Sequence, residues 1–585
     1  MAAINGVARW GIIPLAGNGT QLSYMSQGFR NNYLKSANDQ LRYEIVISDG
    51  GEGAEPSAYK DVVNVIFKVE TSVNDALWTT IGTIKKSRDI ANRRYNGGNA
   101  PNGHRFTIDV SQLVSDQLSY SLCPINKGTW QSNFYGGMNG GLTMQDNVIQ
   151  ITGSSGGSPI SLFNVSDNGT FRRLRVTATF EIIGSDANNG ALEMSTSTEK
   201  VAPSITVINS VNQFERDSLY YYNTFSIADS STVTYQFLTR CPNSVINGYI
   251  AFKKPVRIDE QAEWLQFYIR SSYYNSINDA GTDTVGAIGI KIVTYESDGS
   301  NNTFYLRDFE DNMITTVDTN LKTRPSENQN QMFVQNISPD YIINSGKVWS
   351  PDDARVTYPY WDAYTSSTIT SNTIYYEAYL VKIGMGASFV EERVTKVYKY
   401  TIDRESENIP YGFVRFHWLN SLGAIDSYTA KRDVVEGLTI SRDVVERKSG
   451  DRTWSQDNKG YASAATLSTS SYISDTMRGG DIYKGGREVT NVNAERVQSV
   501  YTEPLNKSVA KWLEEIMLSP NVWIEMETDA TKHGKTVNPY LRPSTKEYIP
   551  VIITNSDVET INQENGLVRF NIEYTLSHKV QTQRN

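Results

Sequence analysis

The sequence contains few of the residues from which catalytic and metal sites are usually built. Its 585 residues include only four histidines and two cysteines. The histidines lie far apart, without the H-x-H or H-E-x-x-H spacing of a metal-binding motif, and two cysteines are too few for a disulfide framework or a thiolate cage. A nucleophile elbow, a P-loop and a coherent dinucleotide fingerprint are also missing. The sequence therefore predicts a protein that is not an enzyme and that needs no cofactor or metal ion.

Long apolar runs and basic clusters are also missing. No segment approaches the ~20 apolar residues that are needed to cross a bilayer, and the N-terminus lacks a basic region followed by an apolar run. The formal net charge is -9, and no stripe of Lys and Arg resembles a phosphate-binding surface. We expect a chain that is synthesised in the cytoplasm, with no membrane span and with no nucleic acid as its main partner.

Tyrosine and strand patterns, in contrast, are abundant. The chain has 35 tyrosines and an aromatic share of 11%. Alternation of apolar and polar residues recurs from end to end, for example in FRRLRVTATFEIIG (171–184), where Leu174, Val176, Ala178 and Phe180 share one face. AIGIKIVTYESDGSNNTFYLRDF (287–309) predicts a hairpin that turns at Asp298-Gly299. RDVVE occurs at 432–436 and again at 442–446, which we interpret as two strand-like segments.

The length exceeds what one hydrophobic core can organise, so several domains are expected. The segments VAPS, near Pro203, and SENIPYG, near Pro410, are candidate boundaries. We predict a mainly β fold of several β-sandwich or barrel-like domains with a small C-terminal α+β unit. The ranges are 1–202 for an N-terminal β domain with long Gly/Ser loops, 203–410 for one or more central β domains, and 411–585 for the C-terminal α+β domain.

One helix interrupts the strand pattern. LNKSVAKWLEEIMLSP predicts a helix from about Asn506 to Leu518, with an apolar stripe on one side and Lys507, Lys511, Glu514 and Glu515 on the other. A strand over 567–577 should carry its own apolar face. We expect Trp512 to contact the sheet that contains this strand. The predicted core of the unit consists of Trp512, Leu513, Ile516, Phe570 and Ile572.

Two clusters of aromatic residues are candidates for interaction surfaces. Tyr and Trp combine an apolar face with a polar tip, which suits subunit interfaces and sugar stacking, but tyrosines also form ordinary cross-strand pairs. All three interpretations stay open, including contact with a host surface glycan. The residues in TYPYWDAYT and LYYYN are Tyr358, Tyr360, Trp361, Tyr364, Tyr220, Tyr221 and Tyr222.

The stretch VRFHWLNSLGAIDSYTAKRD (414–433) places His417 between two aromatic residues. A histidine there is a candidate general base, but its position in a strand-like run favours a side chain that packs beside a sheet or faces solvent. The strand should break after Leu419 and the chain should reverse, with Asp426 able to bond the turn backbone. We therefore predict a structural corner, formed by Trp418, Asn420, Gly423 and Asp426.

This corner also carries a family resemblance. WLNSLGAIDSYT (418–429) resembles a phrase in structural proteins of tailed bacteriophages, Trp-Leu-Asn followed by two variable residues, Gly, then Asp and an aromatic. TYQFLTRCPNS (234–244) and the region from 503 to the C-terminus are also similar to such proteins. Ala424 stands where a second glycine is expected, which allows a looser turn.

The resemblance implies a structural component of the virion. It would be a tail, tail-tip (baseplate) or neck subunit that assembles with itself into a symmetric ring and contacts other tail or neck proteins. The resemblance supplies no catalytic residues. The alternative is a carbohydrate-binding adhesin or a glycan hydrolase, although no β-helix repeat is present and no carboxylate pair stands out among the 64 acidic residues.

Overall fold

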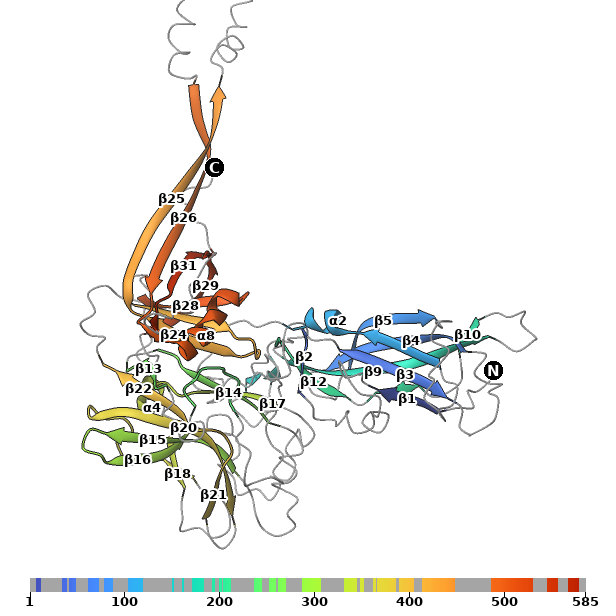
Figure 1. Cartoon of the computed structure of the whole chain (residues 1–585), viewed down its shortest axis with the longest axis horizontal. Helices are drawn as coiled ribbons and strands as arrows, with labels where there is room; N and C mark the ends of the chain where they lie inside the picture. The colour runs from blue at the N-terminus through green and yellow to red at the C-terminus, as the bar shows by residue number, and fades with distance from the viewer. Residues whose placement is uncertain are drawn as a thin grey trace, which may run out of the picture.

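The computed structural model shows a mainly β protein, as the alternating patterns predicted (Figure 1). The residues that it describes are 7–11, 34–38, 41–48, 62–72, 78–87, 104–118, 150–151, 160–161, 171–183, 192–194, 199–202, 204–211, 236–244, 252–258, 261–269, 287–306, 331–344, 348–351, 361–363, 366–385, 389–404, 413–447, 486–529, 544–555 and 567–577.

The N-terminal unit is a sandwich of two sheets around one core. The smaller sheet has three strands in the order β1 (Val7–Gly11), β3 (Arg42–Ser48) and β6 (His104–Asp109). The larger sheet follows the order β2 (Leu34–Ser36), β12 (Ile205–Ile208), β9 (Phe171–Ile183), β4 (Val62–Ser72) and β5 (Thr79–Ser87), with β10 (Leu192–Met194) and β11 (Lys200–Val201) also on β9. The short helix α2 (Ser111–Ser115) follows β6, and β7 (Gln150–Ile151) pairs with β8 (Ile160–Ser161).

Both N-terminal sheets contribute to this core. Tyr43 and Phe106 from the smaller sheet pack in one buried cluster with Phe67 and Val176 from the larger one. The alternation predicted for 171–184 is confirmed, because Leu174, Val176, Ala178 and Phe180 are all buried. Strand β12 follows residue 202 and pairs with β2 and β9 of this sheet.

The central unit is built on an eight-stranded sheet. Its main order is β13 (Lys254–Arg257), β22 (Tyr398–Asp403), β20 (Thr373–Met385), β15 (Ala287–Glu296), β16 (Asn301–Leu306), β18 (Val348–Pro351) and β19 (Trp361–Ala363), and β21 (Phe389–Arg393) pairs with β20. The predicted hairpin is confirmed as β15 and β16, which turn at Gly299 with φ 87.

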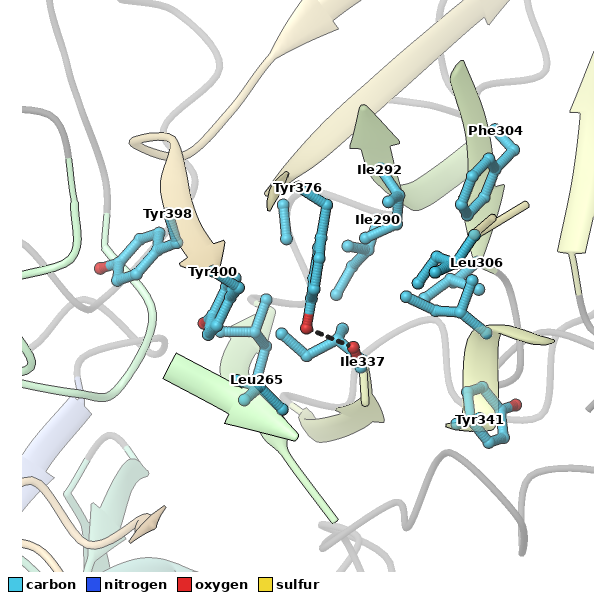
Figure 2. Packing of buried hydrophobic residues seen from close by; sticks show 14 of the residues in the cluster. Leu265, Ile290, Ile292, Phe304, Leu306, Ile337, Tyr341, Tyr376, Tyr398 and Tyr400 are labelled. Atoms are coloured by element: carbon cyan, nitrogen blue, oxygen red, sulfur yellow. Dashed lines mark hydrogen bonds between the residues drawn. The ribbon is translucent and has the colours of Figure 1, made fainter. Parts of the chain in front are cut away.

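A second layer covers one face of this central sheet. It consists of the β-pair β14 (Trp264–Ile269) and β17 (Gln331–Asn336), followed by α4 (Pro339–Asn344). Figure 2 shows the core between the layers, where the Tyr376 hydroxyl donates a 2.9 Å hydrogen bond to the carbonyl oxygen of Ile337. This bond satisfies a buried phenol and ties the second layer to the sheet.

The C-terminal unit is a curled sheet of seven strands. The order is β24 (Ile425–Ala430), β23 (Val414–Leu419), β28 (Val522–Asp529), β29 (Ser544–Ile553), β31 (Asn571–Leu576), β26 (Gly486–Tyr501) and β25 (Arg432–Arg447). The two edge strands, β24 and β25, are separated along the chain by Lys431 alone, so the edges must meet at that corner. The sheet is therefore barrel-like.

Ring contacts across the interior agree with this curl. Phe416 on β23 and Tyr574 on β31 have ring centroids 5.3 Å apart, although two strands lie between them in the sheet order. In a flat sheet the same strands would lie about 14 Å apart. The core of the C-terminal unit therefore lies inside the curled sheet, closed on one side by the helix α8 (Lys507–Leu518).

The predicted helix is confirmed, whereas the strand predicted over 567–577 differs from the prediction. Helix α8 begins after Asn506, whose side chain accepts from the amide of Val509 at 2.9 Å. The expected strand over 567–577 is divided into β30 (Leu567–Val568) and β31, and β30 pairs with β27 (Leu505–Asn506) instead of with the main sheet. Phe570 forms hydrogen bonds with Thr502 at the break. The alternation of apolar residues therefore continues, while the backbone pairing changes from β27 to the strands of the main sheet.

Candidate functional site

The corner predicted at 418–426 lies where the units of the chain meet. Strands β23 and β24 are buried on both faces from Arg415 to Ala430, except for the half-buried Ser421. Phe416 and Trp418 point into the C-terminal core. Arg415, His417 and Ser427 lie on the other face of these two strands, where they contact residues of the central unit. We use the name joint for the contacts that β23, β24 and α8 make with residues 209–211, 236–244, 254–258 and 261–266.

A buried ion network holds the central side of the joint. Glu263 accepts from Arg415 Nη2 at 2.6 Å and from Lys254 Nζ at 2.5 Å, and the same guanidinium donates to Ser427 Oγ and Thr429 Oγ1. Burial by itself would raise the pKa of Glu263, but the charges and hydrogen bonds of Lys254 and Arg415 outweigh it and lower the pKa. All three charged side chains have at most 3% exposure. Removing any one of them would therefore leave a buried charge without its partner, which destabilises the fold.

His417 lies inside the joint and is fully buried. Its Nε2 is 2.8 Å from Glu525 Oε2, and its ring packs 4.9 Å from Trp264 and 5.3 Å from Tyr548. Burial, only partly opposed by Glu525, lowers the pKa of His417, so the ring is neutral at pH 7. Of the two non-catalytic positions expected for this ring, the structure shows the packed one, and a substrate in solvent could not reach it.

The turn of the corner is capped by Asn420, which corrects the role expected of Asp426. Asn420 Oδ1 accepts from the amides of Leu422 and Ala424, each at 3.0 Å, and Nδ2 donates to Leu238 O and Asp426 Oδ2. The amide cap can donate and accept at once, whereas a carboxylate only accepts. Asp426 instead accepts from the Trp512 indole at 2.9 Å and so binds α8 to β24.

Gly423 lies in close contact with the segment that arrives from the N-terminal unit. Its φ is +79, and a Cβ atom at this position would lie 2.5 Å from the carbonyl oxygen of Asn209. Two residues further on, the amide of Val211 donates a 2.8 Å hydrogen bond to Ser421 O. Glycine is required here for both its left-handed backbone and the close approach of residues 209–211.

Helix α8 packs on the C-terminal sheet as expected, with Trp512 against the corner, but one polar residue faces inward. Trp512, Leu513 and Ile516 are buried, and the Trp512 ring lies 5.3 Å from Trp418. Lys507 and Lys511 are exposed. Glu515, expected on the outer face with them, is only 12% exposed and accepts from Ser421 Oγ at 2.6 Å. Burial, reinforced by the charge of Asp426, raises the pKa of Glu515 to about 7.

The second feature of interest is a two-stranded ribbon. Strand β26 pairs with β31 only from Val497 to Tyr501, and beyond that point it pairs with β25 alone. We call residues 438–447 and 486–496 the ribbon; it projects from the body of the unit (Figure 1). Both RDVVE segments lie in the single strand β25, which corrects their interpretation as two strands.

The two faces of the ribbon differ in polarity. Cross-strand pairing places the side chains of even-numbered β25 residues from Leu438 to Val444 on one face, opposite Arg496, Ala494, Val492 and Val489. The large apolar residues on that face are between 41% and 56% exposed: Leu438, Ile440, Val444, Val489 and Val492. This face also carries Arg442 and Arg496, and the opposite face is mainly polar, with Thr439, Ser441, Asp443 and their partners beside the exposed Val445. An amphipathic ribbon therefore extends with its apolar face uncovered by the described residues.

Most of the aromatic candidates lie outside the described residues: Tyr220, Tyr221, Tyr222, Tyr358, Tyr360 and Tyr364. Trp361 begins β19. Tyrosines that the structure describes on the central sheet form cross-strand pairs, such as Tyr295 stacked on Tyr375 at 4.5 Å. The ammonium of Lys253 lies 3.6 Å from the Tyr375 ring centroid. The Tyr375 ring is therefore in contact with both a neighbouring tyrosine and a cation.

Within the described ranges, no group of three or more His, Cys, Asp or Glu side chains is arranged to hold a metal ion. None of the helices in those ranges has the length and apolar character that crossing a bilayer requires. A scan against models of known protein families finds no match for this chain, and a search of curated proteins finds no similar sequence.

Proposed function

We propose that this chain is a structural subunit of a tailed-bacteriophage virion, in the tail, the tail tip or baseplate, or the neck. It assembles with copies of itself into a symmetric ring and contacts other virion proteins. The proposal joins the resemblance of residues 418–429 to phage structural proteins with one structural observation, the amphipathic ribbon. Contact area, not catalysis, is the function that such a feature serves.

The ribbon supports assembly because it is an unfavourable structure in isolation. A two-stranded hairpin is marginally stable in water, and Leu438, Ile440 and Val492 expose large apolar side chains on one face. Ten residues of extended strand reach about 33 Å from the body. Natural proteins usually protect long strand edges, so a ribbon of this length is most readily explained by a partner that covers it.

A second copy of the same chain is the partner that fits the edges. Strands β25 and β26 run in opposite directions and, in the ribbon, each pairs only with the other among the described residues. The β26 edge of one copy can therefore pair antiparallel with the β25 edge of the next. Such a contact uses different surfaces on the two copies, and a contact of this kind forms a ring when the rotation that relates neighbouring copies closes on itself. A stable ring requires about 800 Å² buried per subunit at each contact.

The test compares substitutions on the two faces of the ribbon. Ile440→Lys places a charge on the apolar face, whereas Ser441→Lys places the same charge one residue away on the polar face. Sedimentation velocity of the full chain should show a ring for the wild type and for Ser441→Lys, and a monomer for Ile440→Lys. A wild-type chain that stays monomeric at all concentrations, or equal behaviour of the two variants, would contradict assembly through this face.

The virion assignment has its own measurement. Quantitative mass spectrometry of purified phage particles should find the chain at a fixed copy number that is a small multiple of the ring order. Complete absence of the chain from particles that retain infectivity would refute the virion role and leave the self-assembly result standing.

A further inference from the structure

Three parts of the chain meet at one carboxyl group in the joint. The amide of Val211, on the segment that leaves the N-terminal unit, donates to Ser421 O at 2.8 Å. The hydroxyl of Ser421 donates to Glu515 Oε1 on α8 at 2.6 Å. Arg240, from the segment 236–244, places Nε 3.7 Å from the same oxygen. Glu515 is therefore linked, directly or through Ser421, to the N-terminal, central and C-terminal parts.

The surroundings of Glu515 suit a neutral carboxyl group better than a charged one. Ser421 donates to Oε1 through its hydroxyl group and also acts on the carboxyl group through its backbone amide, while Oε2 is buried and accepts no hydrogen bond from the described residues. Arg240 is the cation that faces the Glu515 carboxyl group, and Asp426, on β24, is the neighbouring acidic group. The charge of Lys254 in turn acts on the carboxyl group of Asp426. An ionised Glu515 would be a largely desolvated charge whose only hydrogen-bond donors among the described residues belong to Ser421 and whose nearest cation, Arg240, lies 3.7 Å away.

We propose that Glu515 is a pH-sensitive latch, whose protonated carboxyl group holds the corner closed on residues 209–211 and whose ionisation loosens that seat. The ionised form must gain water or a second donor, and either change displaces Ser421 or α8. Ser421 carries the hydrogen bond from Val211, so its displacement reaches the N-terminal segment directly. The latch does not depend on the ring proposed above.

The direction of the effect follows from the two protonation states. Burial raises the pKa of Glu515 from 4.5 to about 7 in the closed joint, and an opened joint exposes the group and returns the pKa towards its ordinary value. The closed form therefore binds the extra proton. Closure is strongest below pH 4.5, weakens as pH rises towards 7, and is constant above that value.

Residue-resolved hydrogen exchange at the Val211 amide tests the latch in the full-length protein. Glu515→Gln has the shape of the protonated group and cannot ionise. At any one pH, the intrinsic exchange rate of this amide is the same in both proteins, so the ratio of rates reports the joint. We expect the wild type to exchange Val211 at nearly the variant's rate at pH 5 and about tenfold faster or more at pH 8.

Glu514→Gln is the matched control, because it removes the same charge from the next residue of the same helix. This control should keep the wild-type pH dependence. Within the wild type, Ala202 supplies a reference amide, bonded to Val176 O at 2.8 Å within the N-terminal unit; the ratio of Val211 to Ala202 exchange should rise between pH 5 and pH 7. A flat ratio, or a Glu514→Gln profile that matches Glu515→Gln, would overturn the latch.

Discussion

Replacing Gly423 by alanine tests the geometry of the joint most directly. The backbone at Gly423 has φ +79, and an L-residue in that region costs about 1–2 kcal/mol. The new Cβ would lie 2.5 Å from Asn209 O, whereas ordinary contacts begin at 3.4 Å. Residues 209–211 must therefore move away, which sacrifices the Val211–Ser421 hydrogen bond, worth about 1 kcal/mol. The joint should lose about 2–3 kcal/mol in total.

Gly299 provides the control for the conformational cost of placing an L-residue at a positive φ. It also has a positive φ, +87, but a Cβ there meets nothing within 4 Å, so Gly299→Ala should cost only the conformational 1–2 kcal/mol. Both variants would be compared by calorimetry and by exchange at the Val211 amide, all at pH 5. Only Gly423→Ala should accelerate exchange at Val211. If the amide keeps wild-type protection in Gly423→Ala, residues 209–211 do not rest on the corner as described.

Four further predictions concern the same region. Arg415→Met leaves Glu263 buried with one cation fewer, and chemical denaturation should show a loss of about 3–5 kcal/mol; a loss below 1 kcal/mol would contradict a dry network. Trp418→Ala should lower stability by about 3–5 kcal/mol, and His417→Gln should lower it by about 1–2 kcal/mol, a loss that the role of His417 as a buried structural residue predicts. Because the pKa of Glu515 is raised to about 7 in the folded chain, the wild type should lose about 3 kcal/mol of stability between pH 4.5 and pH 7; a pH titration of the denaturation midpoint should show this loss in the wild type and not in Glu515→Gln.

Local patterns in the sequence were sufficient to predict individual elements. Alternation located the long strand β9, the turn at Asp298-Gly299 located the hairpin of the central unit, and the apolar stripe located α8. Each of these signals depends on residues within a few positions of one another, and each element buries the face that its own spacing defines.

The burial of the second face of β23 and β24 could not be predicted from such local patterns. Arg415 and His417 alternate with aromatic residues as if one face were solvated, yet the covering residue Glu263 is 152 residues away. Glu515 did carry a signal that spacing alone could have detected, because it lies three positions after Trp512 and so on the same side of the helix. The polarity of its side chain outweighed that signal in the sequence-based assignment.

The order of strands in the C-terminal sheet has a consequence for folding during synthesis. Strand β31 is the last of the described strands along the chain, yet it lies between β29 and β26. Until β31 has left the ribosome, both of those strands present an unpaired edge, and the curled sheet cannot close. Long-range pairing of this kind is slow and exposes edges to wrong partners. Closure by β31 therefore delays the completed fold until residue 576 has left the ribosome, and a chain interrupted before that point would retain two unpaired strand edges at the base of its ribbon.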